Sequence, residues 1–419
     1  MEVDRITYLS GAGEDTQLQN YFEFLHPSTR TLSYRDEVLP IGRSGHCVAA
    51  DESNIYVFGG YNPKGRDCHD QSGPPCVLIE LWIYNLSTGA WRKMKTDGIP
   101  DTCASSCLAV VDKRLFVYGG TGYPFGRMMS NTLKILDCRA SLDDKGLERN
   151  RHLCWHLLET NPNEYTALDC GDSSPPRAYG QSLIFQEDAI YVYGGAVGFY
   201  DEAVADLHRL NFNTMSWEKL VPSGSPPLGT YKQEIAKDSE RFYIFGGGRL
   251  HYACNLEMIY AYNFKQNAWI KLKSVPDPAN GFPQPRCSFG LVQTGNDVYI
   301  CGGRFYSTTT SHQSLSDIWH CNLLTLQWRR LDTCLPEPFY FHSVCASPSG
   351  YMYLYGGVRA NGIRSADIYR WKLPLFLTSL TELCWEALVK NSKGLGSMNR
   401  NALLSLGIPA NFVKRLKHL

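Results

Sequence analysis

Arginines recur at matching places around six glycine pairs of this chain, and their chemistry is that of anion recognition. Three follow a glycine pair, and three stand near the start of a repeat: Arg249, Arg304 and Arg359, then Arg43, Arg177 and Arg286. A guanidinium presents a rigid fork of N–H donors that suits the two oxygens of a carboxylate. Because the chain has 41 basic and 41 acidic residues, this recurrence indicates a local anion site rather than a generally basic surface.

Tyrosines occur in the same segments and would form the walls of such an anion-binding pocket. The candidates are Tyr179, Tyr231, Tyr252 and Tyr306. The fourth repeat reads PPLGTYKQE where other repeats begin with Arg, so we expect Tyr231 and Lys232 to take that place. A plainer interpretation stays open for each Arg, namely that it bonds only to carbonyls of its own loop.

The element that must position these side chains is a short β-strand that ends in a glycine pair and occurs six times. The copies are IYVFGG (55–60), LFVYGG (115–120), IYVYGG (190–195), FYIFGG (242–247), VYICGG (298–303) and MYLYGG (352–357). Val, Ile, Tyr and Phe favour packed strands, and a glycine pair permits a tight turn and close approach of the next sheet. Five copies are followed by a second strand and then a Trp: Trp91, Trp155, Trp217, Trp269 and Trp328.

Six such units predict an all-β, six-bladed propeller. The pattern resembles the kelch repeat from about residue 34 to residue 373. The sixth unit, DIYRWKL (367–373), lacks the Trp and the strand that would carry it, so we expect residues 31–39 to supply that strand and close the ring. The predicted organisation is a flexible segment over 1–30, the propeller over 31–373 and a helical tail over 374–419.

The tail is predicted to contain three helices. One starts at Ser379, which forms a capping box with Glu382; one runs from about Asn399 to Leu406 and stops at Gly407; one begins at Pro409. The first, SLTELCWEAL, is apolar on almost every side, and a helix of this kind is not left exposed. Periodicity alone leaves two interpretations open: packing within the chain, or docking in a partner's groove.

The tail also resembles the elongin-binding and cullin boxes of ubiquitin-ligase substrate receptors. The elongin-box positions are Leu380, Leu383, Cys384 and Leu388, and the cullin-box positions are Ile408, Pro409, Phe412 and Val413. In that family the Leu and Cys enter a pocket of elongin C, and the complex adds elongin B and a cullin. Asn411 stands where a cullin-5 box carries a second Pro, so the resemblance implies cullin-2.

Kelch proteins with such a tail resemble receptors that bind a C-terminal degron, the end of a protein marked for degradation. The resemblance implies a pocket for the terminal carboxylate and a small last residue such as Gly or Ala. It favours Arg304 first and Arg249 second, because the carboxylate-binding arginine of the family lies just after a glycine pair. The chain would then be a non-catalytic receptor subunit. The alternative is a kelch scaffold for a cytoskeletal or signalling protein, with the tail only capping the propeller.

Other chemistries fit the sequence poorly. Cys68, His69 and Cys76 share one loop but lack the paired spacing of a zinc site, and we expect neither a metal nor a cofactor. Copper-dependent oxidation by a propeller would need two His and two Tyr at one mouth, for which His251 and His312 are the candidates.

Composition limits the classes of partner and the cellular compartment that we expect for the protein. The balanced charge gives no indication of a nucleic-acid or membrane partner, and no apolar run reaches the roughly 18 residues of a membrane span. Since the N-terminus has no hydrophobic signal core, we expect a cytosolic protein with reduced thiols at its 15 cysteines, and nuclear entry is left open.

Overall fold

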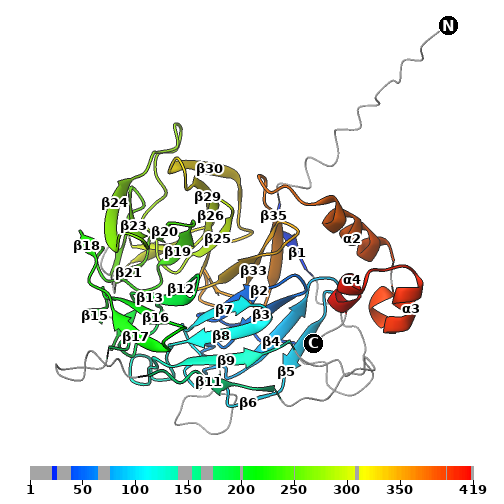
Figure 1. The fold of residues 1–419 in the computed structure, drawn as a ribbon. Helices are drawn as coiled ribbons and strands as arrows, with labels where there is room; N and C mark the ends of the chain where they lie inside the picture. The colour runs from blue at the N-terminus through cyan, green and yellow to red at the C-terminus, as the bar shows by residue number, and fades with distance from the viewer. Residues whose placement is uncertain are drawn as a thin grey trace.

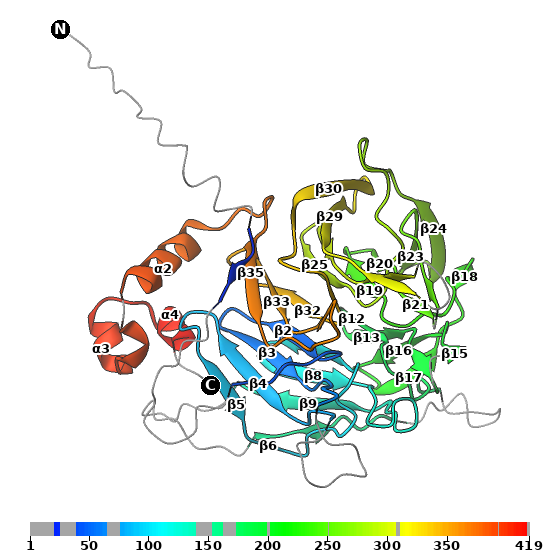
Figure 2. The ribbon, with the colours of Figure 1, turned by 180° about the vertical axis from the view of Figure 1, so that it is seen from behind.

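In the computed structural model, six sheets stand around a common axis and a group of helices lies at one side (Figures 1 and 2). The structure describes residues 21–25, 39–64, 76–139, 153–161, 173–198, 202–249, 251–306, 311–392 and 394–416. Within them, no helix combines the length and the apolar character needed to cross a membrane.

Each sheet is one blade, numbered in chain order. Blade 1 contains β2 (Cys47–Ala50), β3 (Asn54–Phe58), β4 (Leu81–Asn85) and β5 (Trp91–Met94). Blade 2 contains β7 (Cys107–Val111), β8 (Arg114–Tyr118), β9 (Leu133–Asp137) and β11 (His156–Leu157). Blade 3 contains β12 (Ser182–Gln186), β13 (Ala189–Tyr193), β16 (Leu207–Asn211) and β17 (Ser216–Lys219).

The second half of the ring repeats this order. Blade 4 contains β19 (Glu234–Lys237), β20 (Arg241–Phe245), β23 (Met258–Asn263), β24 (Ala268–Lys273) and the added β18 (Ser223–Gly224). Blade 5 contains β25 (Gly290–Thr294), β26 (Asp297–Cys301), β29 (Asp317–Asn322) and β30 (Gln327–Cys334). Blade 6 contains β32 (Ser343–Ala346), β33 (Tyr351–Tyr355), β35 (Ile368–Lys372) and β1 (Glu23–Phe24).

Short two-stranded pairs order the loops between these strands. They are β6 (Thr96–Asp97) with β10 (Leu153–Cys154), β14 (Ala196–Val197) with β15 (Glu202–Ala203), β21 (Gly248–Arg249) with β22 (Tyr252–Ala253), β27 (Arg304–Tyr306) with β28 (His312–Ser314), and β31 (Phe339–Tyr340) with β34 (Val358–Arg359).

The six-bladed propeller is confirmed, but the strand that closes it is not the predicted one. In β1, Glu23 lies opposite Arg370 and Phe24 opposite Tyr369 of β35. This strand comes from the segment predicted to be flexible, whereas 31–38 lie outside the described residues. The pairing has a physical reason, because Glu23 accepts from Arg370 at 2.6 Å and the rings of Phe24 and Tyr369 lie 5.5 Å apart.

The glycine pairs are explained by a side chain wedged between neighbouring blades. A Cβ added to Gly247 would lie 2.7 Å from the Cβ of Gln233, and one added to Gly194 of blade 3 would lie 2.3 Å from the Nε2 of the same residue. Both glycines also have positive φ, 88° and 73°, which side chains disfavour. Side chains at equivalent places meet the other pairs in the same way: His46, Gln181, Phe289 and His342.

In blades 1 to 5, a Trp packs on the aromatic residue that precedes the glycine pair of the blade before it. The pairs, with their centroid distances, are Trp91 on Tyr355 (5.2 Å), Trp155 on Phe58 (5.5 Å), Trp217 on Tyr118 (5.9 Å), Trp269 on Tyr193 (5.4 Å) and Trp328 on Phe245 (6.0 Å). Blade 6 has no such Trp, and the matching position of blade 5 is Cys301 rather than an aromatic residue. The two departures from the repeat therefore belong together.

A closed cycle of backbone hydrogen bonds surrounds the axis where the innermost strands begin. Its six residues have φ between 52° and 68° and are Gly45, Ser105, Gly180, Lys232, Ser288 and Phe341. The amide of each donates to the carbonyl of the member in the preceding blade, so that Ser105 donates to Gly45 at 2.7 Å and Gly45 donates to Phe341 at 3.1 Å. We call these six residues the axial ring. It ties the first blade directly to the last.

Three helices follow the propeller, as predicted: α2 (Leu380–Asn391), α3 (Arg400–Ser405) and α4 (Ala410–Arg415), with the 3-10 turn η2 (Leu395–Ser397) after α2. Ser379 caps α2 by accepting from the amide of Glu382 at 3.3 Å. The carboxylate of Glu382 does not complete the capping box, because it binds Arg415 through two hydrogen bonds of 2.8 Å each. This ion pair joins the first and last helices of the tail.

The tail is attached to the propeller at blade 1. Trp385 of α2 donates its indole N–H to Ser87 at 3.3 Å, and the side-chain amide of Asn85 donates to the carbonyl of Arg415 at 3.0 Å. Asn85 and Ser87 lie at the turn between β4 and β5, and the views place α4 beside these strands (Figures 1 and 2). Specific polar contacts therefore set the orientation of the tail.

Buried histidines between the blades make the stability of the propeller depend on pH. Burial lowers the pKa of His342 to about 4, and burial together with nearby Arg43 holds the pKa of His46 well below its ordinary value. Between pH 4 and pH 6.5 the unfolded chain therefore binds more protons than the folded chain, so stability is complete above about pH 6.5 and falls as the pH drops through this window. Each histidine contributes up to about 1.4 kcal/mol per pH unit.

The measurement is the free energy of unfolding in urea between pH 7 and pH 5 for the wild type and His342→Gln. Gln181 and Gln233 occupy the same position in blades 3 and 4, so the variant is expected to fold. The slope of its unfolding free energy against pH should be smaller by about 1.4 kcal/mol per pH unit, which corresponds to the uptake of one proton fewer on unfolding. An unchanged slope would contradict the assignment of His342 as a neutral, buried group.

Candidate functional site

Two arginines of the predicted anion site instead make buried contacts within their own blades. Arg43 and Arg286 are fully buried, and each donates to the carbonyl of the first glycine in its own blade's pair, at 3.0 and 3.1 Å. Arg43 also binds Glu80 at 2.6 Å, and Arg286 binds Asp317 through two bonds of 2.9 Å. Their prediction as ligand-binding residues is corrected, because their donors are occupied within the protein.

The other arginines at the mouth, Arg304 apart, lie on its rim or are neutralised. Arg359 pairs with Glu337 at 3.0 Å and with Asp367. Arg177 is exposed, and Arg249 is exposed with its Nε donating to the carbonyl of Gly229 at 2.8 Å. Tyr252, opposite Arg249 in the β21–β22 pair, is 49% exposed. None of these side chains lines the axial cavity among the innermost strands.

Arg304 is different, because its guanidinium lies among aromatic rings. Its Nη2 donates to the hydroxyl of Tyr231 at 2.8 Å. Its Cζ lies 5.1 Å from the ring centroid of Tyr306, 5.6 Å from that of Tyr340 and 5.0 Å from that of Phe341. Such faces stabilise a cation. We call these five residues the arginine cage.

The charge of Arg304 has no acidic partner among the described residues, and its Nε is buried without a hydrogen bond there. Burial alone would lower the pKa of this guanidinium, but Tyr231, Cys287 and Tyr306 raise it overall, so it stays charged. Arg304 is half-buried, and charges withdrawn from water are normally paired. The cage is therefore a place where an incoming anion would be stabilised.

Further aromatic residues extend the walls of the cage. The ring of Tyr179, a predicted site residue, lies 6.3 Å from that of Tyr231. On the other side, the ring of His251 lies 6.3 Å from Tyr306, and that of His312 lies 6.4 Å from Tyr306 and 5.4 Å from Tyr340. The structure thus brings together four predicted residues: Arg304, Tyr179, Tyr231 and Tyr306.

Two His and two Tyr do line this wall, as a copper site would require. However, Arg304 lies over both Tyr rings, and its positive charge opposes a copper ion there. Within the described residues, no three His, Cys, Asp or Glu side chains gather as metal ligands, and the 13 cysteines found there are free. Cys68 and His69 lie outside the described residues.

Two members of the cage, Tyr340 and Phe341, are absent from the predicted site. They come from EPFYFHS, just before the innermost strand of blade 6. Tyr340 pairs with Val358 after the glycine pair, as Tyr231 pairs with Gly248 in blade 4. Aligning this segment with the equivalent segment of blade 4 places Tyr340 at the position of Tyr231 and Phe341 at that of Lys232. Such an alignment of the repeats would have identified both residues.

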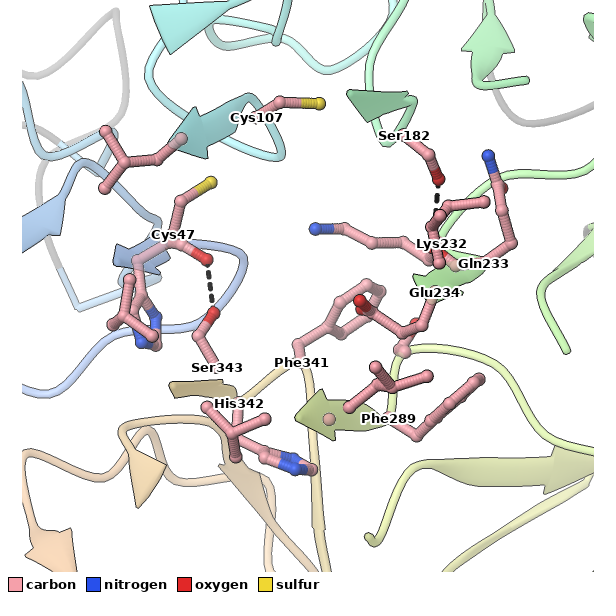
Figure 3. A pocket seen from close by; sticks show the side chains of 18 of the residues that line it. Cys47, Cys107, Ser182, Lys232, Gln233, Glu234, Phe289, Phe341, His342 and Ser343 are labelled. Atoms are coloured by element: carbon pink, nitrogen blue, oxygen red, sulfur yellow. Dashed lines mark hydrogen bonds between the residues drawn. The ribbon is translucent and has the colours of Figure 1, made fainter. Parts of the chain in front are cut away.

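An axial cavity of about 220 Å³ lies beside the cage, among the innermost strands of all six blades (Figure 3). Phe341 belongs to both, since it contacts Arg304 and lines the cavity. Lys232 and Glu234 extend from blade 4 toward the middle of the cavity (Figure 3). Burial raises the pKa of Glu234 to about 7, although Lys232 acts in the opposite direction.

The first helix of the tail turns an apolar stripe to solvent. Leu380 is 76% exposed, Leu383 47% and Leu388 37%, and Cys384 is exposed beside them. The opposite side of α2 carries Trp385, which is buried in the core of the tail. The four residues of the predicted elongin box therefore share one accessible face.

Three of the four predicted cullin-box residues are buried in the tail itself. Ile408, Phe412 and Val413 belong to its core, where Phe412 lies 4.8 Å from Trp385 between ring centroids. Their prediction as contact residues is corrected, because the apolar spacing reflects packing of α4 against α2. Pro409 is exposed and is the one residue of the four that is open to a partner.

Comparison with known proteins identifies the repeat. Residues 2–145 and 142–357 match the family described as the KLHDC2/KLHL20/DRC7 Kelch-repeats domain. Kelch domain-containing protein 10 of Rattus norvegicus is 37% identical over 387 residues, which cover 90% of this chain and 86% of that protein. Kelch domain-containing protein 2 of Bos taurus is 26% identical over 334 residues, 77% of either chain.

Two further comparisons extend this result. The Kelch domain-containing protein 10 homolog of Drosophila melanogaster is 32% identical over 412 residues, 91% of this chain and 64% of that protein. Among solved structures, YjhT matches with a TM-score of 0.58 at 13% identity, over 80% of this chain and 97% of that chain, which is a likeness of fold alone. The family match and the relatives more than 30% identical show that this chain belongs to the kelch-repeat proteins, within the family of the KLHDC2/KLHL20/DRC7 Kelch-repeats domain.

Proposed function

We propose that this chain is the substrate receptor of an elongin B/C–cullin-2 ubiquitin ligase, whose arginine cage binds the C-terminal carboxylate of its targets. The observation that carries the proposal is the guanidinium of Arg304, which is held by Tyr231 and three ring faces and faces no acidic group among the described residues. A ligand carboxylate would supply the missing charge through strong, charge-assisted hydrogen bonds.

The surroundings of Arg304 favour a chain end with a small last residue. Four aromatic side chains already contact one guanidinium, so a bulky side chain next to the carboxylate would meet these rings. Gly or Ala avoids this overlap. The exposed Arg249 and Arg177 on the rim would then interact with more distant parts of the target.

The tail would attach this receptor to the ligase. The stripe of Leu380, Leu383, Cys384 and Leu388 has the spacing of a helix that lies in an apolar groove, and we assign that groove to elongin C. Elongin B and cullin-2 would join through elongin C, with Pro409 at the exposed start of α4 as a further contact. The receptor performs no bond chemistry and acts by proximity.

The test measures the binding of fluorescent peptides that end in Gly or Ala, with a free or an amidated C-terminus. Arg304→Gln should weaken binding of the free acid at least about tenfold, as expected for the loss of a hydrogen bond between charged groups. Amidation should weaken binding to the wild type by a similar factor, and to Arg304→Gln hardly at all. Arg329→Gln, which removes an exposed arginine of the outermost strand of blade 5, is the matched control and should bind nearly as the wild type does.

Equal binding of acid and amide by the wild type would rule out carboxylate recognition. Equal affinity of wild type and Arg304→Gln for the free acid would remove the cage from the site.

A further inference from the structure

The axial cavity departs from the symmetry of the propeller in one blade. At the axial-ring position, blades 1, 2, 3, 5 and 6 carry Gly45, Ser105, Gly180, Ser288 and Phe341, whereas blade 4 carries Lys232. Two residues further on, the same blades carry Cys47, Cys107, Ser182, Gly290 and Ser343, whereas blade 4 carries Glu234. Since five blades fold without a charge at these places, the fold does not require this pair.

Four of the other polar side chains in the cavity lining are already engaged between blades, whereas the hydroxyl of Ser288 and the side-chain amide of Gln181 are buried without a hydrogen bond among the described residues. Cys47 donates to the carbonyl of Ser106 at 2.6 Å, and Cys107 to that of Gln181 at 3.1 Å. Ser182 and Ser343 donate to the carbonyls of Gln233 and His46, at 3.4 and 2.7 Å. The thiol and hydroxyl protons of these four residues are therefore used in hydrogen bonds within the propeller and are not available as donors to a ligand.

Lys232 and Glu234 are not engaged in this way. Neither makes an ion pair or a side-chain hydrogen bond with the residues that the structure describes, although they stand in the same cavity. An ammonium donor and a carboxyl acceptor thus face the cavity without a hydrogen-bonding partner among the described residues.

We propose that Lys232 and Glu234 bind a carboxamide group, the side chain of Gln or Asn near the end of the target. The amide carbonyl would accept from Lys232 and the amide N–H would donate to Glu234. A neutral group fits best above the pKa of about 7 that burial gives Glu234, because Glu234 is then ionised and the pair carries no net charge. A single ion would lose its hydration there and face one like charge as well as one opposite charge. Apolar neighbours in the lining, such as Leu108 and Val344, suit the methylene stem of Gln.

This inference rests on the proposed function and names the sequence that it would prefer. Lys232 directly follows Tyr231 of the cage, and Phe341 lines both the cage and the cavity. Because an extended peptide advances about 3.3–3.6 Å per residue, a residue two to four places from the C-terminus would lie beside the cavity while the carboxylate binds Arg304.

The experiment uses the full chain and peptides that end in Gly with a free carboxylate. Gln, Met or Glu is placed in turn at the second, third and fourth position from the end. At one of these positions Gln should bind about tenfold more tightly than Met, which has a similar length without the two hydrogen bonds. Gln should also bind more tightly than Glu, which Glu234 would repel.

Two variants copy other blades and are therefore expected to fold. Lys232→Gly reproduces Gly45 and Gly180 and relieves the positive φ, and Glu234→Ser reproduces Ser182 and Ser343. Each should reduce the difference between Gln and Met to less than about threefold, while the Met peptide keeps its affinity and its dependence on a free carboxylate.

The outcomes separate this inference from the proposed function. If no peptide with a free carboxylate binds the wild type, the proposed function fails. If peptides bind through Arg304 but Gln and Met bind equally, or if both variants keep the preference for Gln, the carboxamide site is wrong and the carboxylate site stands. Tightest binding by Glu would identify an anion site around Lys232 and overturn the assignment.

Discussion

Replacement of both Leu380 and Cys384 by Asp is expected to abolish recovery of elongin C, elongin B and cullin-2 with the tagged protein. Leu380 is 76% exposed and Cys384 lies in the same stripe, so neither substitution disturbs the core of the tail. In the complex, however, each Asp would place a charge in an apolar groove. The loss of two interface anchors at about 2 kcal/mol or more each corresponds to a weakening of roughly 1,000-fold.

The matched control is Leu324→Asp, since Leu324 is 75% exposed and lies between β29 and β30 of blade 5 rather than on the tail. It should leave all three partners bound. Partners retained by the double Asp variant would mean that the stripe is not the docking face. If the wild type itself recovers none of them, the tail is a cap held to blade 1 by Trp385 and Asn85, and the scaffold interpretation replaces the receptor.

The second large effect is expected from Asp317→Ala, which should lower the free energy of unfolding by about 3–5 kcal/mol. Arg286 is fully buried and Asp317 is 17% exposed, and the carboxylate also accepts from the indole of Trp319 at 2.6 Å. Without Asp317, the guanidinium of Arg286 would stay buried with only carbonyl partners. Arg286 lowers the pKa of Asp317, and burial opposes this effect without reversing it.

Urea denaturation at pH 7 measures this prediction, with Asp206→Ala as the comparison. Asp206 pairs with Lys219 at 2.7 Å, but both side chains are exposed, 42% and 54%, so its loss should change stability by less than about 1 kcal/mol. Glu80→Ala removes the equivalent partner of Arg43 in blade 1 and should resemble Asp317→Ala. A small effect in both would show that these buried pairs do not stabilise their blades.

The repeat was predictable because each of its features serves local packing. A glycine pair, an aromatic residue before it and a Trp after it interact within their own blade and with its immediate neighbours, so spacing along the chain is enough to infer them. The helix starts were predictable for the same reason, since Ser379 and Asn399 each accept from an amide three residues ahead.

The roles of the arginines were not predictable from position alone. Arg286 and Arg304 belong to one blade and look equally suited to an anion, yet Arg286 meets Asp317 whereas Arg304 meets rings from blades 4, 5 and 6. One usable signal was the acidic residue just before or at the start of the third strand, Glu80 or Asp317, which accompanies the buried arginines. The burial of Phe412 likewise depends on how α4 meets α2, which no local pattern encodes.

The axial ring closes the propeller near its axis, whereas β1 closes it at the outer edge of blade 6. The outer fastening is β1, which holds β35 through only two residues, and it would peel away under a pull on the N-terminal segment. The inner one is the hydrogen bond from Gly45 to Phe341, which does not involve β1 and would remain after β1 has detached. The first and last blades separate only when this second connection also breaks.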